Sequence, residues 1–459
     1  MPPRVEDSLS ELGETLRPIL KATETRGSSY KERVMNGQER RIIKMMNNKK
    51  GDMTPFDMKK RPCKQLPLLL PVIWGASFLL TRKYGLKIKR TGMENVKPPY
   101  LVISMHQGFS DYYIAPLSVF PRRASYVSDM EGFAAFGDTI YRKIGCIGTR
   151  RFVSDICTLS NIKYALDKNK NIVFLFPEAR HSNVGTTSAL PDDLGKLVKY
   201  LSVPVAVLSI HGSYLASPFW DEEHTRKTKM TAELKLLFTE DELRNIDEET
   251  AAEKIINALQ YNEYKWQYDN KIKIAYKNRA EGLSNVLYQC AECGKEYVTF
   301  DKGAELFCNS CGASWTMTEY GQLKGKNGSV INIPDWYEQQ RENLKQELEN
   351  GDYRVEFEVD IEALPNEKGF VKMGKGVLVH DKSGFSLDIP NSGKHLFFPT
   401  KRLYTVQTEY NYKGKGKCIV LSTRDCCYYL YSKSPEFNPT KLQFAAEIIH
   451  GELIVKEQR

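Results

Sequence analysis

The sequence lacks an apolar run long enough to cross a membrane as one helix. Its longest such run, residues 66–80, contains only fifteen residues, whereas a spanning helix needs about 20. No apolar run follows Met1, so a cleaved signal peptide is not expected. Repeats and low-complexity tracts are also absent. We therefore expect a globular protein that remains in the cytosol.

A disulfide framework is not expected either, although the chain contains 10 cysteines. Four of them form a metal-binding pattern, and the other six show no disulfide-like layout. The six are Cys63, Cys146, Cys157, Cys418, Cys426 and Cys427. This distribution agrees with a reducing compartment.

Positive charge is concentrated near the N-terminus. Residues 31–64 contain eleven Lys or Arg against four acidic residues, which accounts for most of the +9 formal charge. Such a segment can bind nucleic acid or an anionic membrane surface, and the apolar run that follows favours the membrane. Pro67 and Pro71 interrupt the start of that run, so we predict a re-entrant or interfacial anchor over 66–80 on the cytoplasmic face. A buried core helix is the alternative.

The segment from residue 65 to residue 277 alternates short apolar stretches with amphipathic ones. This pattern predicts an α/β fold with a mixed, largely parallel sheet covered by helices. The expected strands are 100–105, 124–128, 171–176, 203–210 and 230–238, and the expected helices are 153–166, 192–201 and one or two within 240–277. The basic segment 1–64 stands apart, with helices expected at 9–22 and 31–46.

A histidine and a carboxylate follow the first of these expected strands. His106 ends the strand, Gly108 can turn the chain, and Asp111 lies five positions after His106. Five positions along one helix correspond to about 140° of rotation, so the two side chains can meet only across a turn. A carboxylate beside a histidine fixes its tautomer and leaves the other ring nitrogen free to take a proton from a hydroxyl. The spacing alone could arise by chance.

Two further blocks carry polar side chains in the same segment. Residues 145–151 combine glycines with Arg150 and Arg151, whose planar guanidinium groups can bind phosphate. A surface loop with solvated arginines would have the same sequence pattern. Residues 176–182 follow another expected strand, and Pro177 there pushes the next polar side chains out at the strand end. An ordinary helix cap would also explain Glu178.

Taken together, these blocks resemble those of the glycerolipid acyltransferase superfamily, in particular the bacterial 1-acylglycerol-3-phosphate acyltransferases. His106 and Asp111 match the His-x4-Asp signature, and Arg151 stands at the arginine of the second block, often Gly-Gly-Ile-Pro-x-x-Arg. Residues 176–178 match the start of the third block, Phe-Pro-Glu-Gly-Thr-Arg-Ser, and 203–205 match the fourth. The chain departs from the family at 179–181, where Ala-Arg-His replaces Gly-Thr-Arg.

The resemblance implies that 65–277 is an acyltransferase domain. His106, oriented by Asp111, would remove the proton from a glycerol hydroxyl, which would attack an acyl thioester without a covalent acyl-enzyme. The acceptor would be positioned by Arg150, Arg151, Glu178, Arg180 and His181. The altered third block leaves open whether Arg180 or His181 supplies the cation for the acceptor's phosphate.

The expected product is phosphatidate, made from 1-acylglycerol-3-phosphate and either acyl-CoA or acyl carrier protein. A basic protein would suit an acidic carrier. A second enzymatic hypothesis is a different acceptor: glycerol-3-phosphate, another lysophospholipid or an amino-acid-headed lipid. A third hypothesis is a non-catalytic membrane adaptor, against which the intact His106, Asp111 and Glu178 argue.

Two additions follow this domain. Cys290, Cys293, Cys308 and Cys311 form two knuckles separated by fourteen residues, which predicts a zinc ribbon over 286–322 with a closed, structural Zn²⁺. No concentrated basic patch accompanies it, so nucleic acid is not an expected partner. After a linking helix at 335–350, short alternating strands and a final helix predict a mainly-β domain over 353–459, similar in architecture to pleckstrin-homology-like folds. Asn438 should begin that helix and Gly451 should end it.

Overall fold

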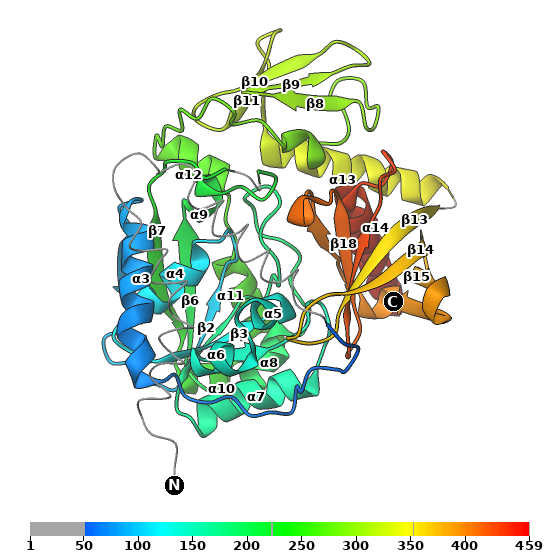
Figure 1. Ribbon diagram of the computed structural model, residues 1–459. Helices are drawn as coiled ribbons and strands as arrows, with labels where there is room; N and C mark the ends of the chain where they lie inside the picture. The colour runs from blue at the N-terminus through cyan, green and yellow to red at the C-terminus, as the bar shows by residue number, and fades with distance from the viewer. Residues whose placement is uncertain (1–50, 222–223, 352, 459) are drawn as a thin grey trace, which may run out of the picture.

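The computed structural model describes residues 51–221, 224–351 and 353–458. The helices expected at 9–22 and 31–46 lie outside these residues. Figure 1 shows an α/β part, a small sheet above it and a C-terminal β part beside it, with one long helix running between the small sheet and the C-terminal part.

The α/β part is built on a seven-stranded sheet in the order β1-β7-β6-β2-β5-β3-β4. Only β6 and β7 pair antiparallel, which confirms the predicted largely parallel sheet. The strands are β1 Lys87–Thr91, β2 Tyr100–Ser104, β3 Ala124–Ser128, β4 Cys146–Gly148, β5 Ile172–Leu175, β6 Val205–His211 and β7 Thr231–Phe238. Every residue of β2 is buried, because β2 lies centrally between β5 and β6.

Helices cover both faces of this sheet (Figure 1). Alternate residues of β2 enter two different cores, with Leu101 and Ile103 in one and Tyr100 and Val102 in the other. The helices are α4 Asp111–Ser118, α5 Met130–Phe136, α6 Asp138–Lys143, α7 Ile156–Asp167, α8 Leu194–Leu201, α9 Ser213–Ala216, α10 Glu240–Asn245, α11 Glu248–Ala258 and α12 Glu263–Asp269.

The region 240–277 contains three helices, so the prediction of one or two was wrong. Asp247 accepts a hydrogen bond from the backbone N–H of Thr250 at 2.7 Å and thereby begins α11. Asn262 begins α12 in the same way through the N–H of Lys265, at 2.9 Å. These capping side chains divide what composition alone presents as one helical stretch.

The apolar run forms a short turn, η1 Pro67–Leu69, and helix α3 Leu70–Arg82. Leu70, Ser77 and Thr81 are buried, whereas Leu68 and Phe78 are about three-fifths exposed, at 62% and 59%. Among the described residues, no helix is both long enough and apolar enough to cross a membrane.

The second sheet has five strands in the order β12-β11-β10-β9-β8. Its strands are β8 Thr299–Lys302, β9 Glu305–Cys308, β10 Ser314–Met317, β11 Gln322–Gly325 and β12 Val330–Asn332. The long helix α13, Ile333–Asn350, follows directly and confirms the predicted linking helix.

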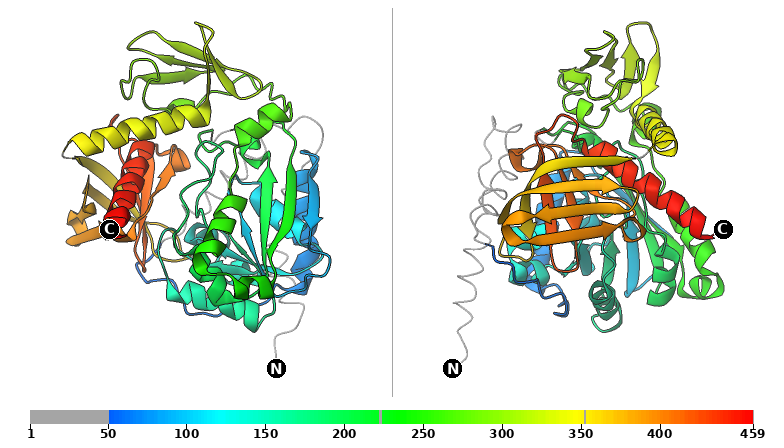
Figure 2. Two further views of the ribbon diagram at one scale, coloured as in Figure 1. Left: turned by 180° about the vertical axis from the view of Figure 1, so that it is seen from behind. Right: turned by 90° about the vertical axis from the view of Figure 1, so that its right-hand side faces the viewer.

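The C-terminal sheet has seven antiparallel strands in the order β16-β15-β14-β13-β19-β18-β17, so that two meanders, β13 to β16 and β17 to β19, are joined by the pairing of β13 with β19. Its strands are β13 Arg354–Leu364, β14 Val371–Asp381, β15 Gly384–Ile389, β16 Lys394–Pro399, β17 Gln407–Glu409, β18 Cys418–Ser422 and β19 Cys427–Tyr431. Figure 2 shows α14, Pro439–Gln458, lying along this sheet. The mainly-β prediction is therefore confirmed.

Helix α14 begins as predicted and ends later than predicted. Asn438 accepts a hydrogen bond from the N–H of Lys441 at 3.1 Å. The helix then continues through Gly451, because one glycine costs a helix only about 1 kcal/mol and neither proline nor a capping side chain follows it.

One buried apolar cluster joins the parts of the molecule. Val184 and Tyr214 of the α/β part pack in it with Trp336 and Tyr337 of α13 and with Phe444 of α14. The C-terminal part is thus held against the α/β part by a continuous core.

Candidate active site

The turn after β2 brings His106 and Asp111 together. Nδ1 of His106 lies 3.1 Å from Oδ2 of Asp111. The same carboxylate oxygen accepts hydrogen bonds from the backbone N–H groups of Gln107, at 2.6 Å, and Gly108, at 3.0 Å. Asp111 is the first residue of α4, so the turn and the helix start together fix its carboxylate on the histidine.

Burial shifts the pKa values of both groups. His106 is 8% exposed and Asp111 is fully buried. Burial, reinforced by the nearby charge of Arg151, lowers the pKa of His106 to about 3. Burial raises the pKa of Asp111 to about 6. At neutral pH the imidazole is therefore neutral and the carboxylate ionised, which is the combination a general base requires.

The second ring nitrogen of His106 faces a tyrosine. Nε2 lies 3.4 Å from the hydroxyl of Tyr112, and the two rings meet edge to face. With Nδ1–H directed at Asp111, Nε2 has its lone pair available for a substrate proton. Tyr112 is 42% exposed, so the residue that Nε2 faces reaches the surface of the molecule.

Glu178 supports the backbone at the end of β2. One carboxylate oxygen accepts the N–H of His106 at 2.9 Å, and the other accepts the N–H of Ser188 at 2.8 Å. The carbonyl of His106 accepts the N–H of Ser182 at 3.1 Å. Burial raises the pKa of Glu178 to about 7. The third block therefore holds the backbone of His106 on both sides.

His181 is brought directly to the dyad. Its ring centroid lies 4.2 Å from that of His106, with the rings edge to face. Its Nε2 is buried and has no hydrogen-bond partner within the described residues. Burial holds the pKa of His181 well below its usual value, so the ring is neutral.

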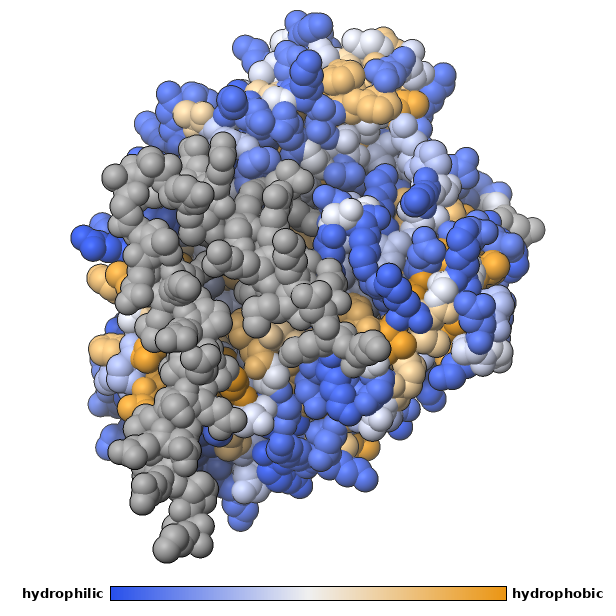
Figure 3. All heavy atoms as spheres, in the orientation of Figure 1, coloured by the Kyte–Doolittle hydropathy of each residue, from blue (hydrophilic) through white to orange (hydrophobic). Residues whose placement is uncertain are grey.

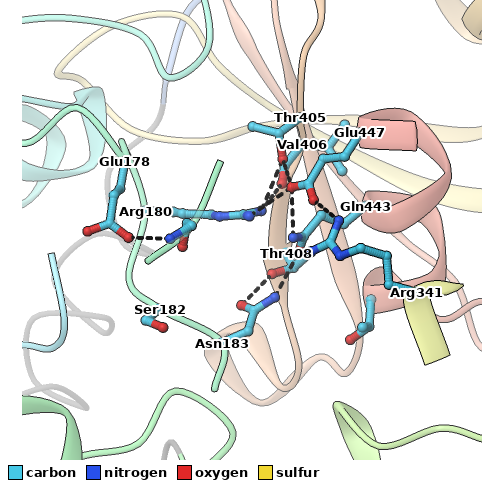
Figure 4. A network of polar contacts seen from close by, with 12 residues as sticks. Glu178, Arg180, Ser182, Asn183, Arg341, Thr405, Val406, Thr408, Gln443 and Glu447 are labelled. Carbon is cyan, nitrogen blue, oxygen red and sulfur yellow. Dashed lines mark hydrogen bonds and ion pairs between the residues drawn. The ribbon is translucent and has the colours of Figure 1, made fainter. Parts of the chain in front are cut away.

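Arg180 points the other way, into the C-terminal part (Figure 4). Its guanidinium donates to the carbonyl of Val406 at 3.0 Å, to the hydroxyl of Thr405 at 3.2 Å and to Glu447 of α14 at 2.9 Å. Glu447 also pairs with Arg341 of α13. Arg180 is therefore not placed beside His106, and a direct contact with the acceptor stays a prediction.

The two arginines of the second block also have protein partners. Arg150 donates to the carbonyls of Arg424, at 2.5 Å, Pro365, at 3.1 Å, and Asp425, at 3.0 Å. Arg150 thus fastens the C-terminal part and is not brought to the dyad.

Arg151 is close enough to depress the pKa of His106 and is surrounded by carboxylates. It pairs with Asp129 and lies 3.9 Å from Glu131 and 3.8 Å from Glu409. Asp129 and Glu131 belong to the start of α5, whereas Glu409 comes from β17. From the sequence, Asp129 could be identified as the N-cap of a short helix near Arg151. Nothing in the sequence indicates that the distant Glu409 lies beside this arginine.

The four predicted metal ligands also converge. The sulfur atoms of Cys290 and Cys311 are 3.8 Å apart, those of Cys293 and Cys308 are 3.9 Å apart, and all four lie within 4.8 Å of one another. A tetrahedral ion with metal–sulfur bonds of about 2.3 Å needs sulfur atoms about 3.8 Å apart. The cluster therefore fits a tetrahedral metal.

Comparisons with known proteins found similarities to a family model and to solved structures. Residues 87–211 match the family model described as Acyltransferase. Among solved structures, the chain is similar to the 1-acyl-sn-glycerophosphate (LPA) acyltransferase PlsC from Thermotoga maritima. The two share 16% sequence identity over 54% of this chain and 92% of that chain, with a TM-score of 0.33. No curated protein matches the chain.

Proposed function

We propose that the protein, whose residues 87–211 match the Acyltransferase family model, transfers a fatty acyl group from an acyl thioester to a glycerol hydroxyl of a lysophospholipid. The observation that carries this proposal is the contact between His106 and Asp111 at the carboxyl end of β2. Open α/β sheets bind ligands at this end of their strands.

The dyad supports direct transfer. Nε2 of His106 takes the proton of the acceptor hydroxyl while its Nδ1–H donates to Asp111, which stabilises the resulting imidazolium. The oxygen attacks the thioester carbonyl, a new C–O bond forms, the C–S bond breaks, and the departing thiolate takes the proton from His106. No acyl-enzyme is required.

Substituting His106→Ala is expected to lower the rate of acyl transfer by at least about 100-fold, since general base catalysis typically contributes that much. The measurement is the transfer of radiolabelled acyl groups from a thioester to lysophospholipid in vesicles. His395→Ala is the control, because this histidine lies on the C-terminal sheet and its side chain is 60% exposed. Equal rates for His106→Ala and the unsubstituted protein would contradict the proposal.

Candidate acceptors and donors follow from the sequence. The sequence favours 1-acylglycerol-3-phosphate, which would make the product phosphatidate and the process phospholipid biosynthesis. Acyl-CoA and acyl carrier protein are both candidate donors. The adaptor hypothesis predicts no acylation with any of these pairs.

The protein is further proposed to act at the cytoplasmic membrane surface. The exposed face of the α3 region carries Leu68, Phe78 and Leu79, and Phe120 lies beside it in contact with Trp74 of α3. Figure 3 shows hydrophobic residues at the left edge of the molecule, where Figure 1 places α3. An apolar helix face of this kind suits insertion into the upper layer of a bilayer, where a single-chain acceptor resides.

The four-cysteine cluster is proposed to bind a structural Zn²⁺. Gly294 and Gly312 follow the two cysteine pairs with positive φ angles of 70° and 75°, and their N–H groups donate back to the carbonyls of Cys290 and Cys308. These are the tight turns that direct two thiolates at one ion. Four protein ligands leave no open position, so the metal would have no part in acyl transfer.

A further inference from the structure

The loop that follows β5, residues 176–183, supports the catalytic histidine. Glu178 accepts the N–H of His106 at 2.9 Å, and the N–H of Ser182 donates to the carbonyl of His106 at 3.1 Å. The ring of His181 packs against the imidazole, with 4.2 Å between the ring centroids. The position of the imidazole therefore depends on the position of this loop.

Arg180 fastens the same loop to helix α14. Its guanidinium donates to Glu447 at 2.9 Å, and Glu447 also pairs with Arg341 of α13 and accepts the hydroxyl of Thr405 at 2.6 Å (Figure 4). Although burial opposes ionisation, the guanidinium groups of Arg341 and Arg180 lower the pKa of Glu447 to about 2, so this carboxylate is charged at neutral pH. Charged, directional hydrogen bonds of this kind fix the geometry of both partners.

Asn183 fastens the loop a second time. Its amide donates to the hydroxyl of Tyr337 at 3.0 Å and to the side-chain oxygen of Gln443 at 2.7 Å, and its own oxygen accepts the hydroxyl of Thr408 at 3.2 Å. These partners come from α13, α14 and β17. The loop is thus anchored on both sides of His181 by elements beyond the α/β part.

The backbone of the loop needs such support. Ala179 has a φ angle of 51°, in the left-handed region that is costly for a residue with a side chain. A residue other than glycine keeps this conformation only where its surroundings hold it. Ala179 directly precedes the anchored Arg180, so loss of that anchor would let the loop relax and disturb its contacts with His106.

We propose that Glu447 is a positioning residue of the active site. Through Arg180 it holds the loop after β5 in the conformation in which Glu178 and Ser182 fix the backbone of His106. The C-terminal part thereby acts on the reaction without touching the substrate. This inference rests on the proposed function and gives the C-terminal part a role in it.

The test is the substitution Glu447→Gln in the full-length protein, which keeps the size of the side chain and removes its charge. Transfer from acyl-CoA to lysophosphatidate in vesicles gives kcat and the KM for the acceptor. We expect kcat to fall about tenfold, because a small misplacement of a catalytic group lowers the rate strongly. The KM should change by less than about threefold, since Glu447 does not contact the acceptor.

Lys441→Gln is the matched control. Lys441 lies on the same helix, its side chain is 14% exposed against 9% for Glu447, and it pairs with Glu296 and Glu347. Its removal leaves Arg180 with its partners, so kcat and KM should both stay within about twofold of their original values. The Tm of each variant is measured so that the rates refer to folded protein.

A double variant shows whether Glu447 acts through Arg180. If it does, Arg180→Met combined with Glu447→Gln lowers kcat no further than the more damaging single substitution, because both remove the same interaction. The rival role for Arg180 is direct binding of the acceptor's phosphate. In that case Arg180→Met raises the KM and Glu447→Gln leaves kcat unchanged, which overturns the positioning role.

Hydrogen exchange of the loop is a second measurement, made without substrate. The amides of residues 176–188 should exchange faster in Glu447→Gln than in the unsubstituted protein or in Lys441→Gln, because local opening becomes easier. Unchanged exchange of these amides, or an unchanged kcat, overturns the inference and leaves the acyltransferase function standing. If the unsubstituted protein acylates no lysophospholipid from acyl-CoA or acyl carrier protein, the proposed function falls and this inference falls with it.

Discussion

At His106, burial and a carboxylate act on one imidazole in opposite directions. Burial disfavours the imidazolium, and Asp111 supports it when the proton arrives from the acceptor. The resting histidine is thus kept neutral far below neutral pH, while its charged form is stabilised at the moment of transfer.

The pH dependence of the reaction should therefore report carboxyl groups. Burial raises the pKa of Asp111 to about 6 and that of Glu178 to about 7, whereas the pKa of His106 is lowered to about 3. As the pH falls, the two carboxylates take up protons first, and Asp111 ceases to support the imidazolium. We expect kcat/KM to fall as the pH drops from about 7 to about 6.

The measurement is a pH profile of kcat/KM for the unsubstituted protein, Asp111→Asn and Glu178→Gln. Removing a titrating carboxyl should remove its part of the acid limb, although the maximal rate also falls. An acid limb that appears only near pH 3 would assign the titration to His106 and contradict this expectation.

At the scale of elements, helix α3 carries apolar side chains that the rest of the described protein leaves exposed. Replacing Phe78 and Leu79 with serine removes two side chains that are 59% and 45% exposed. Fully burying such a side chain in an apolar phase contributes about 1.5 to 3 kcal/mol, so the double variant should bind anionic vesicles at least about tenfold more weakly.

Flotation with vesicles measures this binding. Because both side chains are exposed, the fold should persist, and the matched control is the exposed Phe300 of the ribbon, replaced by serine. Unchanged flotation of the double variant would exclude α3 as the membrane contact.

The elements also show where sequence patterns succeed. Strands β2 and β3 are found within one residue of their predicted bounds, because apolar residues with turn residues on either side define them. β1, with the sequence Lys-Ile-Lys-Arg-Thr, was missed, since an edge strand half exposed to solvent lacks that pattern. The dyad was predictable because its residues are local, whereas Glu409 and Glu447 meet the arginines of the family blocks only through tertiary packing.

At the scale of the whole molecule, the ribbon and the C-terminal part share a core with the catalytic domain through α13. Cys290, Cys308 and Trp315 belong to the same buried cluster as Tyr214 and Phe444. Loss of the proposed Zn²⁺ should therefore also weaken the packing outside the ribbon.

Metal analysis of the purified full-length protein is expected to give about one equivalent of zinc, bound by four thiolates. Cys308→Ser should reduce this content and lower the Tm, because binding of a structural metal contributes directly to folding. Cys157→Ser is the control, since this cysteine lies on α7 outside the cluster. Less than about half an equivalent in the unsubstituted protein would contradict the assignment.

The pairing of Arg180 with Glu447 has a consequence for how the protein folds during its synthesis. A ribosome makes the third block long before it makes α14, so the nascent catalytic domain carries an arginine whose carboxylate partner does not yet exist. An unpaired arginine at such a position is costly to bury. The ion pair that anchors the loop next to His106 to the C-terminal part can therefore form only after α14 has been synthesised.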